Sequence, residues 1–359
     1  MTKTERTFLL DLLQTPSPTG FEVAGQKKWA GYVRKHADSV ENDAYGTTWA
    51  TLAGRSKKVP SVMIEAHADE IGYMVKQITS EGFLRIDRIG GSDAATARGR
   101  RLDIFGDKGT IRGIIGNTAI HIREDQSTEK SPKANQLYVD IGASSAKEVT
   151  AAGIRVGHPA VYADGAEEFG KGKLTGRALD NRIGGFIIAR VIAELAKAKS
   201  RPTATCLAVN AVQEEIGGFG AKMAAYRLMP DVCLVLDVTH ATDTPGIDKA
   251  KHGDVILGGG PTLTHGTGNH VQVVKRLQQV AKRAEIPIQD EASSRATGTD
   301  TDSIYHMREG IPCALISLPM RYMHSVVETV DLKDVERVIQ LMVAFVKSVK
   351  ATDKFSVKV

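Results

Sequence analysis

The sequence predicts an α/β protein, with a mainly parallel sheet covered by helices on both faces and a small all-β domain inserted into it. Buried-strand segments alternate with amphipathic helical segments before residue 71 and again after residue 165, a pattern typical of parallel sheets. In between, short alternating runs follow one another, separated by turn signals. The expected domains are therefore residues 1–70 with 166–359, which form the α/β part, and residues 71–165, which form the insert.

The elements of the α/β part follow from hydrophobic periodicity. Helical spacing predicts helices at 5–14, 21–37, 182–198, 269–284 and 331–349. Continuous apolar runs predict buried strands within 59–72, 203–213, 231–238 and 311–318. In the insert, strands are expected at 72–78, 83–89, 101–105, 109–116, 135–142 and 159–164, with one helix at 145–153.

Composition excludes several classes of function. The chain is 42% apolar and 25% charged, as ordinary globular proteins are, and its net charge is only +5. Aromatic residues make up 5% and no basic block interleaves with them, so no nucleic-acid partner is expected. Cys206, Cys233 and Cys313 lie in apolar runs without metal-type spacing, which indicates buried thiols in a reducing compartment. No signal peptide or membrane-spanning stretch is evident, so we expect a cytoplasmic protein without a membrane partner.

Residues of metal-ligating types follow several predicted strands of the α/β part. They are His67 and Asp69; Glu214 and Glu215; Asp237, with His240 and Asp243 further on; His324; and Asp180, which precedes a helix. In open α/β sheets, sites form where the strands end at their carboxyl edge. We therefore expect these side chains, contributed by five segments, to converge.

Each of these residues also has an ordinary structural interpretation. Asp180 could cap the helix that follows it. Glu214 and Glu215 could complement a helix dipole, and Asp237 could be a turn residue. Taken together, these interpretations require five coincidences at one edge of one sheet, and we reject them in favour of a metal site.

The mixture of histidine and carboxylate suits divalent first-row metals, zinc foremost, with cobalt or manganese also acceptable. Five ligands and a spare glutamate suit two metals that share a bridging carboxylate, about 3.5–4 Å apart. One of the adjacent glutamates would then bind metal, and its neighbour would act as general base toward a bridging water. Asp69 lies two residues beyond His67, on the same strand face, and is expected to orient its imidazole.

Six segments occur in an order that resembles a known family. They are "EAHADEIGYMV", "GRALDNRIGG", "VQEEIGGFGA", "LDVTHATDTPG", "GTDTD" and "PMRYMHS". The pattern resembles the tetrahedral aminopeptidases, cytosolic di-metal peptidases that include glutamyl, leucyl and lysyl aminopeptidases. The resemblance covers essentially the whole chain, including the insert.

The resemblance implies a role for each site residue. The implied roles are: His67 and Asp237 bind one metal, Glu215 and His324 bind the other, Asp180 bridges the two, Glu214 is the general base, and Asp69 is the partner of His67. It also implies a cis bond between Asp180 and Asn181. The insert would be a PDZ-like assembly domain, and dimers would build a hollow tetrahedral dodecamer.

The expected activity is hydrolysis of the amino-terminal peptide bond of short peptides, through a metal-bridging water that Glu214 activates. Thr299 and Asp300 of "GTDTD" are expected on the substrate side. Arg295 and Arg321 lie near site segments and could favour an acidic first residue, or could be solvated or paired structurally. The specificity pocket itself cannot be derived from the sequence.

Three other functions are weighed against this one: a deacylase, an endoglucanase and a silent assembly protein. Related di-metal folds remove acyl groups from amino acids, so a deacylase is one alternative. An endoglucanase is disfavoured, because glycoside hydrolysis normally uses a pair of carboxyl groups and not a metal cluster. A catalytically silent assembly protein is disfavoured because every expected ligand and the base are present.

Overall fold

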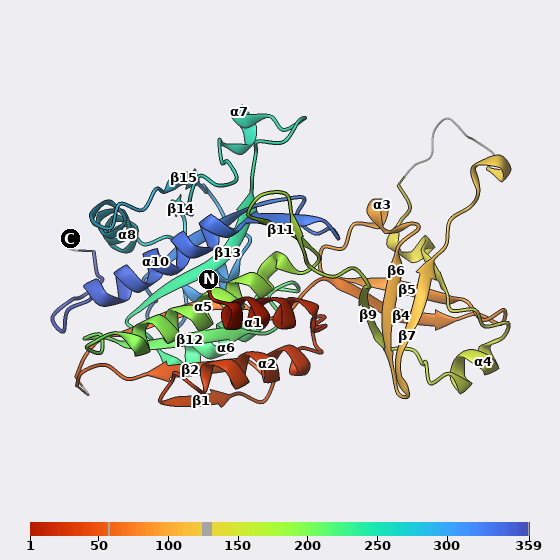
Figure 1. Cartoon of the computed structure of the whole chain (residues 1–359), viewed down its shortest axis with the longest axis horizontal. Coiled ribbons are helices and arrows are strands. Elements are labelled where there is room, and N and C mark those ends of the chain that lie inside the picture. Colours follow the sequence, from red (N-terminus) through yellow and green to blue (C-terminus); the bar gives the residue numbers. More distant parts are fainter. Residues whose placement is uncertain (57, 124–130, 358) are drawn as a thin grey trace.

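The protein has an α/β body and a β-barrel that stands to one side of it (Figure 1). The computed structural model describes residues 1–56, 58–123, 131–357 and 359, so residues 124–130 of the expected insert lie outside the described part. Within the described part, no helix is both long enough and apolar enough to cross a membrane.

The body is built on one large sheet. Its strands are β1 (Ser39–Asn42), β2 (Thr48–Leu52), β3 (Ser61–His67), β10 (Glu167–Phe169), β11 (Lys173–Gly176), β12 (Thr205–Ala211), β13 (Val232–His240), β14 (Thr262–His265), β15 (Gln289–Ala292), β16 (Cys313–Arg321) and β17 (Glu328–Asp331). The main order across the sheet is β1-β2-β12-β3-β13-β16-β17-β11-β10, and β14 joins β15 to β16. The predicted parallel arrangement is confirmed for the centre, where β12, β3, β13 and β16 run parallel, whereas both flanks pair antiparallel.

Helices cover both faces of this sheet. They are α1 (Lys3–Gln14), α2 (Val23–Val33), α5 (Leu179–Lys197), α6 (Phe219–Leu228), α8 (Val271–Arg283), α9 (Asp300–Ile304) and α10 (Leu332–Ser348). The short helix α7 (Lys249–His252) has no buried residue and projects away from the sheet (Figure 1). Alternate residues of β3 enter different cores: Ile64 packs with α1, α2, α5, α8 and α10, and Met63 packs with α6 and α9. This alternation is what a sheet buried on both sides requires.

The barrel closes in the order β4-β5-β8-β7-β6-β9. Its elements are β4 (Gly72–Ile78), β5 (Leu84–Ile89), α3 (Ala94–Ala97), β6 (Arg101–Gly106), β7 (Gly109–Ile115), the 3-10 helices η1 (Ile120–Ile122) and η2 (Ala134–Gln136), β8 (Tyr138–Asp140), α4 (Ala146–Ala151) and β9 (Pro159–Tyr162). It has its own apolar core, in which the hydroxyls of Tyr73 and Tyr162 lie 2.7 Å apart. A small closed barrel leaves no free sheet edge.

The five helices predicted from periodicity are present, and the three cysteines are buried free thiols, as expected. The sequence analysis missed mainly short elements. Strands β14 and β15 have four residues each, and α6 begins at Phe219, after the paired glutamates.

Candidate active site

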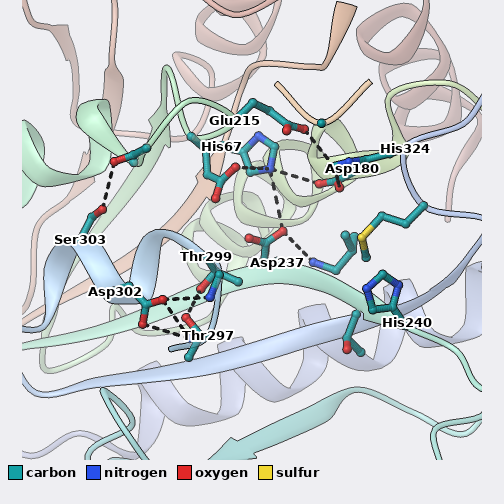
Figure 2. A pocket seen from close by; sticks show the side chains of 18 of the residues that line it. His67, Asp180, Glu215, Asp237, His240, Thr297, Thr299, Asp302, Ser303 and His324 are labelled. Atoms are coloured by element: carbon teal, nitrogen blue, oxygen red, sulfur yellow. Dashed lines mark hydrogen bonds and ion pairs between the residues drawn. The ribbon is translucent and has the colours of Figure 1, made fainter. Parts of the chain in front are cut away.

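A cavity of about 670 Å³ opens where the central parallel strands end (Figure 2). Two groups of side chains face it. The ligand wall consists of His67, Asp180, Glu214, Glu215, Asp237 and His324. The far wall consists of Thr239, His240, Glu291, Thr297, Thr299 and Asp302.

Strand geometry brings His67 and Asp237 together. His67 is the last residue of β3, and Asp237 lies near the end of the neighbouring parallel strand β13. Val235 of β13 is in register with Glu65 of β3, so two residues further on Asp237 lies level with His67 and on the same face. The His67 Nε2 atom is 3.8 Å from the Asp237 Oδ1 atom.

Asp180 lies between two imidazoles, at the start of α5. Its Oδ1 atom is 3.1 Å from His67 Nε2, and its Oδ2 atom is 3.2 Å from His324 Nε2. The peptide bond from Asp180 to Asn181 is cis, as the resemblance implied. A carboxylate whose two oxygens face different histidines has the arrangement that a bridging ligand needs.

The two adjacent glutamates approach different histidines. They follow β12 in a loop that begins with Gln213 at a φ of 62°. The Glu214 Oε2 atom is 3.8 Å from His67 Nε2, and the Glu215 Oε1 atom is 3.5 Å from His324 Nε2. The two adjacent carboxylates thus point to separate parts of one cluster.

Asp69 holds this cluster from behind. Its carboxylate accepts hydrogen bonds from the backbone N–H groups of Glu214 and Glu215, at 3.0 and 3.2 Å, and from the Thr19 hydroxyl at 2.9 Å. The His67 Nδ1 atom is 3.1 Å from the backbone oxygen of Asp69 and 3.5 Å from its carboxylate. Asp69 therefore orients both the imidazole and the loop that carries the paired glutamates.

Among the described residues that line the cavity there is no lysine or arginine, so His67 and His324, whose pKa values are raised by the nearby carboxylates against the effect of burial, are the cationic partners of the ligand wall. Burial and the nearby Asp180 raise the pKa of Glu215, and burial likewise raises the pKa of Asp237 despite the neighbouring His67. Burial raises the pKa of Glu214 to about 8, against the attraction of His67 and with further repulsion from carboxylates such as Asp300. Asp180 behaves differently, because hydrogen bonds from His324 and His67 outweigh burial and lower its pKa.

Such crowding of buried acids is what a bound cation would relieve. Ligand atoms within 4.8 Å of one another form three groups in the described chain: His67, Asp180 and Asp237; Asp180, Glu215 and His324; and His67, Glu214 and Glu215. The first two groups share Asp180 and coincide with the two ligand sets that the resemblance implied. These residues therefore fit a pair of divalent cations.

Glu328 is a residue that the sequence analysis missed. It begins β17, is 1% exposed, and accepts hydrogen bonds from the backbone N–H groups of His324, at 2.9 Å, and of Asp180, at 3.1 Å. It thus ties two ligands to one buried carboxyl group. The barrel also reaches this point: a Cβ added to Gly91 would lie 2.4 Å from the His324 ring, so only glycine fits there.

Three expected substrate contacts have different outcomes. Thr299 lines the cavity, and its hydroxyl accepts a hydrogen bond from Thr301 N at the start of α9. Asp300 does not line it, because the side chain turns inward beside Glu65 and is 1% exposed; burial and Glu65 raise its pKa. Arg321 is also outside the lining, since its guanidinium makes two hydrogen bonds to Asp243, at 2.8 and 2.6 Å. Of the three, the structure thus places only Thr299 in the cavity lining, and it shows the structural pairing that the sequence left open for Arg321.

The chain is similar over most of its length to aminopeptidases, both in sequence and in structure. The family model described as M42 glutamyl aminopeptidase matches residues 46–341. A lysyl aminopeptidase of Pyrococcus furiosus is 33% identical over 346 residues, covering 95% of this chain and 96% of the relative. A TET aminopeptidase structure from a marine sediment archaeon, Thaumarchaeota archaeon SCGC AB-539-E09, has a TM-score of 0.91 at 31% identity and covers 96% of each chain. The TET1 peptidase of Pyrococcus horikoshii, whose structure is described as assembling into a tetrahedron or a large octahedral shell, has a TM-score of 0.84 at 26% identity, over 96% of this chain and all of that one.

Proposed function

Because the chain belongs to the M42 glutamyl aminopeptidase family, we propose that it is a two-metal aminopeptidase that removes the first residue of short peptides. One observation carries this proposal. The two oxygens of Asp180 lie between two histidines, and each histidine has a further carboxylate within 3.8 Å: Asp237 beside His67, and Glu215 beside His324. A single-metal site would need only one half of this arrangement.

The residues suit two cations with a shared ligand. His67 and Asp237 would hold one, Glu215 and His324 the other, and Asp180 both. When bound, divalent metals supply polarisation of a peptide carbonyl and a water of lowered pKa. Zinc is the proposed metal, and cobalt and manganese fit the same donor set.

Glu214 is the proposed general base. Its side chain is 14% exposed, so it reaches the cavity, and it is not needed to complete either ligand set that shares Asp180. A carboxylate that reaches the cavity can accept a proton from a water there, and bound metals would lower the pKa of that water and so ease the transfer. The hydrogen bonds from the loop to Asp69 fix where that carboxylate stands.

The proton transfers then balance. Glu214 takes a proton from the attacking water while the oxygen of that water forms a bond to the carbonyl carbon. When the carbon–nitrogen bond breaks, Glu214 returns that proton to the leaving amine. The carboxylates around the cavity attract the positively charged amino terminus of a peptide, which favours exopeptidase over endopeptidase action.

The assembly and location follow as part of the same proposal. The barrel is proposed to be a PDZ-like domain that joins dimers into a tetrahedral dodecamer, and the shell described for the Pyrococcus horikoshii relative supports this. A cytoplasmic location is supported by three buried cysteines that remain free thiols.

The test is an assay of metal-stripped protein on leucine p-nitroanilide and on its N-acetylated form, with zinc, cobalt or manganese added back. The proposal expects metal-dependent release from the free-amino substrate only. Release from the N-acetylated substrate would instead identify a deacylase or an endopeptidase. No release from either substrate by metal-loaded protein would contradict the proposed activity.

A further inference from the structure

The far wall carries negative charge without a cation to balance it. Among the described residues that line the cavity there is no lysine or arginine, whereas Glu291 and Asp302 both face it. The structure records no ion pair for either carboxylate within the described chain. Asp302 accepts the backbone N–H groups of Thr297 and Gly298, each at 2.8 Å, so it holds its own loop (Figure 2).

Glu291 lines the cavity, and neutral hydroxyl groups hold its carboxylate in place. Its Oε1 atom accepts the Thr239 hydroxyl at 2.7 Å, and its Oε2 atom accepts the hydroxyls of Thr262 and Thr264, each at 3.4 Å. Hydroxyl groups orient a carboxylate but do not neutralise it. The half-buried Glu291 thus presents a fixed negative charge to whatever enters the cavity.

The position of Glu291 matches the length of a basic side chain. Thr239, its closest partner, lies two residues beyond Asp237 on the same face of β13. Two residues of strand span about 7 Å. An extended lysine side chain spans about 6 Å from its Cα to its ammonium nitrogen. A first residue whose backbone sits at the ligand wall can therefore bring its ammonium group to Glu291.

The residues that could have favoured an acidic substrate are not available. Arg321 is paired with Asp243, and Arg295 is exposed and lies outside the cavity lining. An acidic side chain at the far wall would be repelled by the carboxylates of Glu291 and Asp302. We propose that the far wall selects peptides with a lysine or arginine as first residue, and that Glu291 is the specificity-determining residue. This inference rests on the proposed aminopeptidase function.

The test compares lysine with norleucine, which has the same chain without the ammonium group. We would measure kcat/KM of the metal-loaded enzyme on the p-nitroanilides of lysine, norleucine and glutamate, at one pH and one ionic strength for all three substrates. The wild type should prefer lysine to norleucine by about ten- to a hundredfold, the value of a charge-assisted contact. Glutamate should be the poorest substrate.

Two variants separate charge recognition from structural effects. Glu291→Gln should reduce the lysine-to-norleucine ratio to about 1–3, through loss of kcat/KM on lysine. Asp290→Asn is the matched control, because Asp290 is the preceding acid of β15, pairs with the exposed His265 and does not line the cavity. It should keep the wild-type ratio. If Glu291→Gln does not fold, the wild type still gives a readout, since high salt should lower the ratio.

The possible outcomes test the preference for a basic first residue separately from the proposed aminopeptidase activity. A wild type that releases norleucine well but shows no preference for lysine would overturn the inference and leave the aminopeptidase proposal intact. An unchanged ratio in Glu291→Gln would also overturn it, since the charge would then be read elsewhere. No release from any free-amino substrate would overturn both.

Discussion

The two walls of the cavity hold carboxylates in different ways. On the ligand wall, Glu215 and Asp237 lie buried among other acids, and their pKa values are raised. On the far wall, Glu291 and Asp302 are held by hydroxyl and N–H donors. On the ligand wall the acids repel one another, which indicates that they are arranged to bind metal cations. On the far wall the acids accept hydrogen bonds from neutral groups, which indicates that they are arranged to recognise a positive charge on the substrate.

The comparison predicts that a change on the ligand wall affects every substrate equally, whereas a change on the far wall alters their ranking. The largest effect is expected for Glu214→Gln, which keeps the shape of the side chain but removes the proton acceptor. Turnover should fall ~10²–10⁴-fold on all free-amino substrates. Metal content, measured on the same sample, should match the wild type, and near-normal turnover would exclude Glu214 as the base.

A smaller effect is expected for Glu328→Gln, which touches the ligands only through their backbones. Asp180 N donates to Oε2 of Glu328 and His324 N donates to Oε1, and an amide puts an NH₂ donor in place of one of these two acceptor oxygens. Metal affinity should weaken about 10–100-fold, as for other residues that orient ligands. Glu167→Gln, at an exposed position of β10, is the matched control. Equal metal affinity in the two variants would show that Glu328 does not position the ligands.

The smallest effect concerns stability and pH. In the metal-free protein the pKa values of Glu214 and Glu65 are raised to about 8, and that of His67 is also raised. In the folded state these groups retain protons that they release in the unfolded state, so the stability that they contribute is full at low pH and is lost as the pH rises from about 5 to about 8.

Thermal unfolding of metal-stripped protein across this range would check the sign. The midpoint should decrease toward pH 8, and added zinc should raise it most at the high end, where the ligands bind metal in their deprotonated forms. A metal-free midpoint that increases steadily from about pH 5 to about pH 8 would contradict the charge crowding assigned to the ligand wall.

The two walls also differ in how far the sequence predicted them. The ligand wall could be anticipated, because its members follow long apolar strands such as β3 and β13, and the ends of parallel strands share one edge. Glu291 could not be, since β15 has only four residues and its charged pattern gives no strand signal. Its role depends on hydroxyls from β13 and β14, which only the folded sheet brings near it.

Asp300 and Arg321 show the same limit, because neither lies in the cavity lining. Asp300 and Thr299 are adjacent, but the first turn of α9 directs Asp300 toward Glu65 and leaves Thr299 at the cavity. Arg321 lies close to His324 in sequence, yet its charge is taken by Asp243 from another segment. Side-chain direction and long-range pairing, and not residue type, decided these positions.

The most direct test of the account is an anomalous diffraction experiment at the zinc edge on crystals of zinc-loaded protein. The account predicts two peaks on the ligand wall, one among His67, Asp180 and Asp237 and the other among Asp180, Glu215 and His324. A single peak would contradict the two-metal centre, and so would two peaks of which only one lies within bonding distance of Asp180.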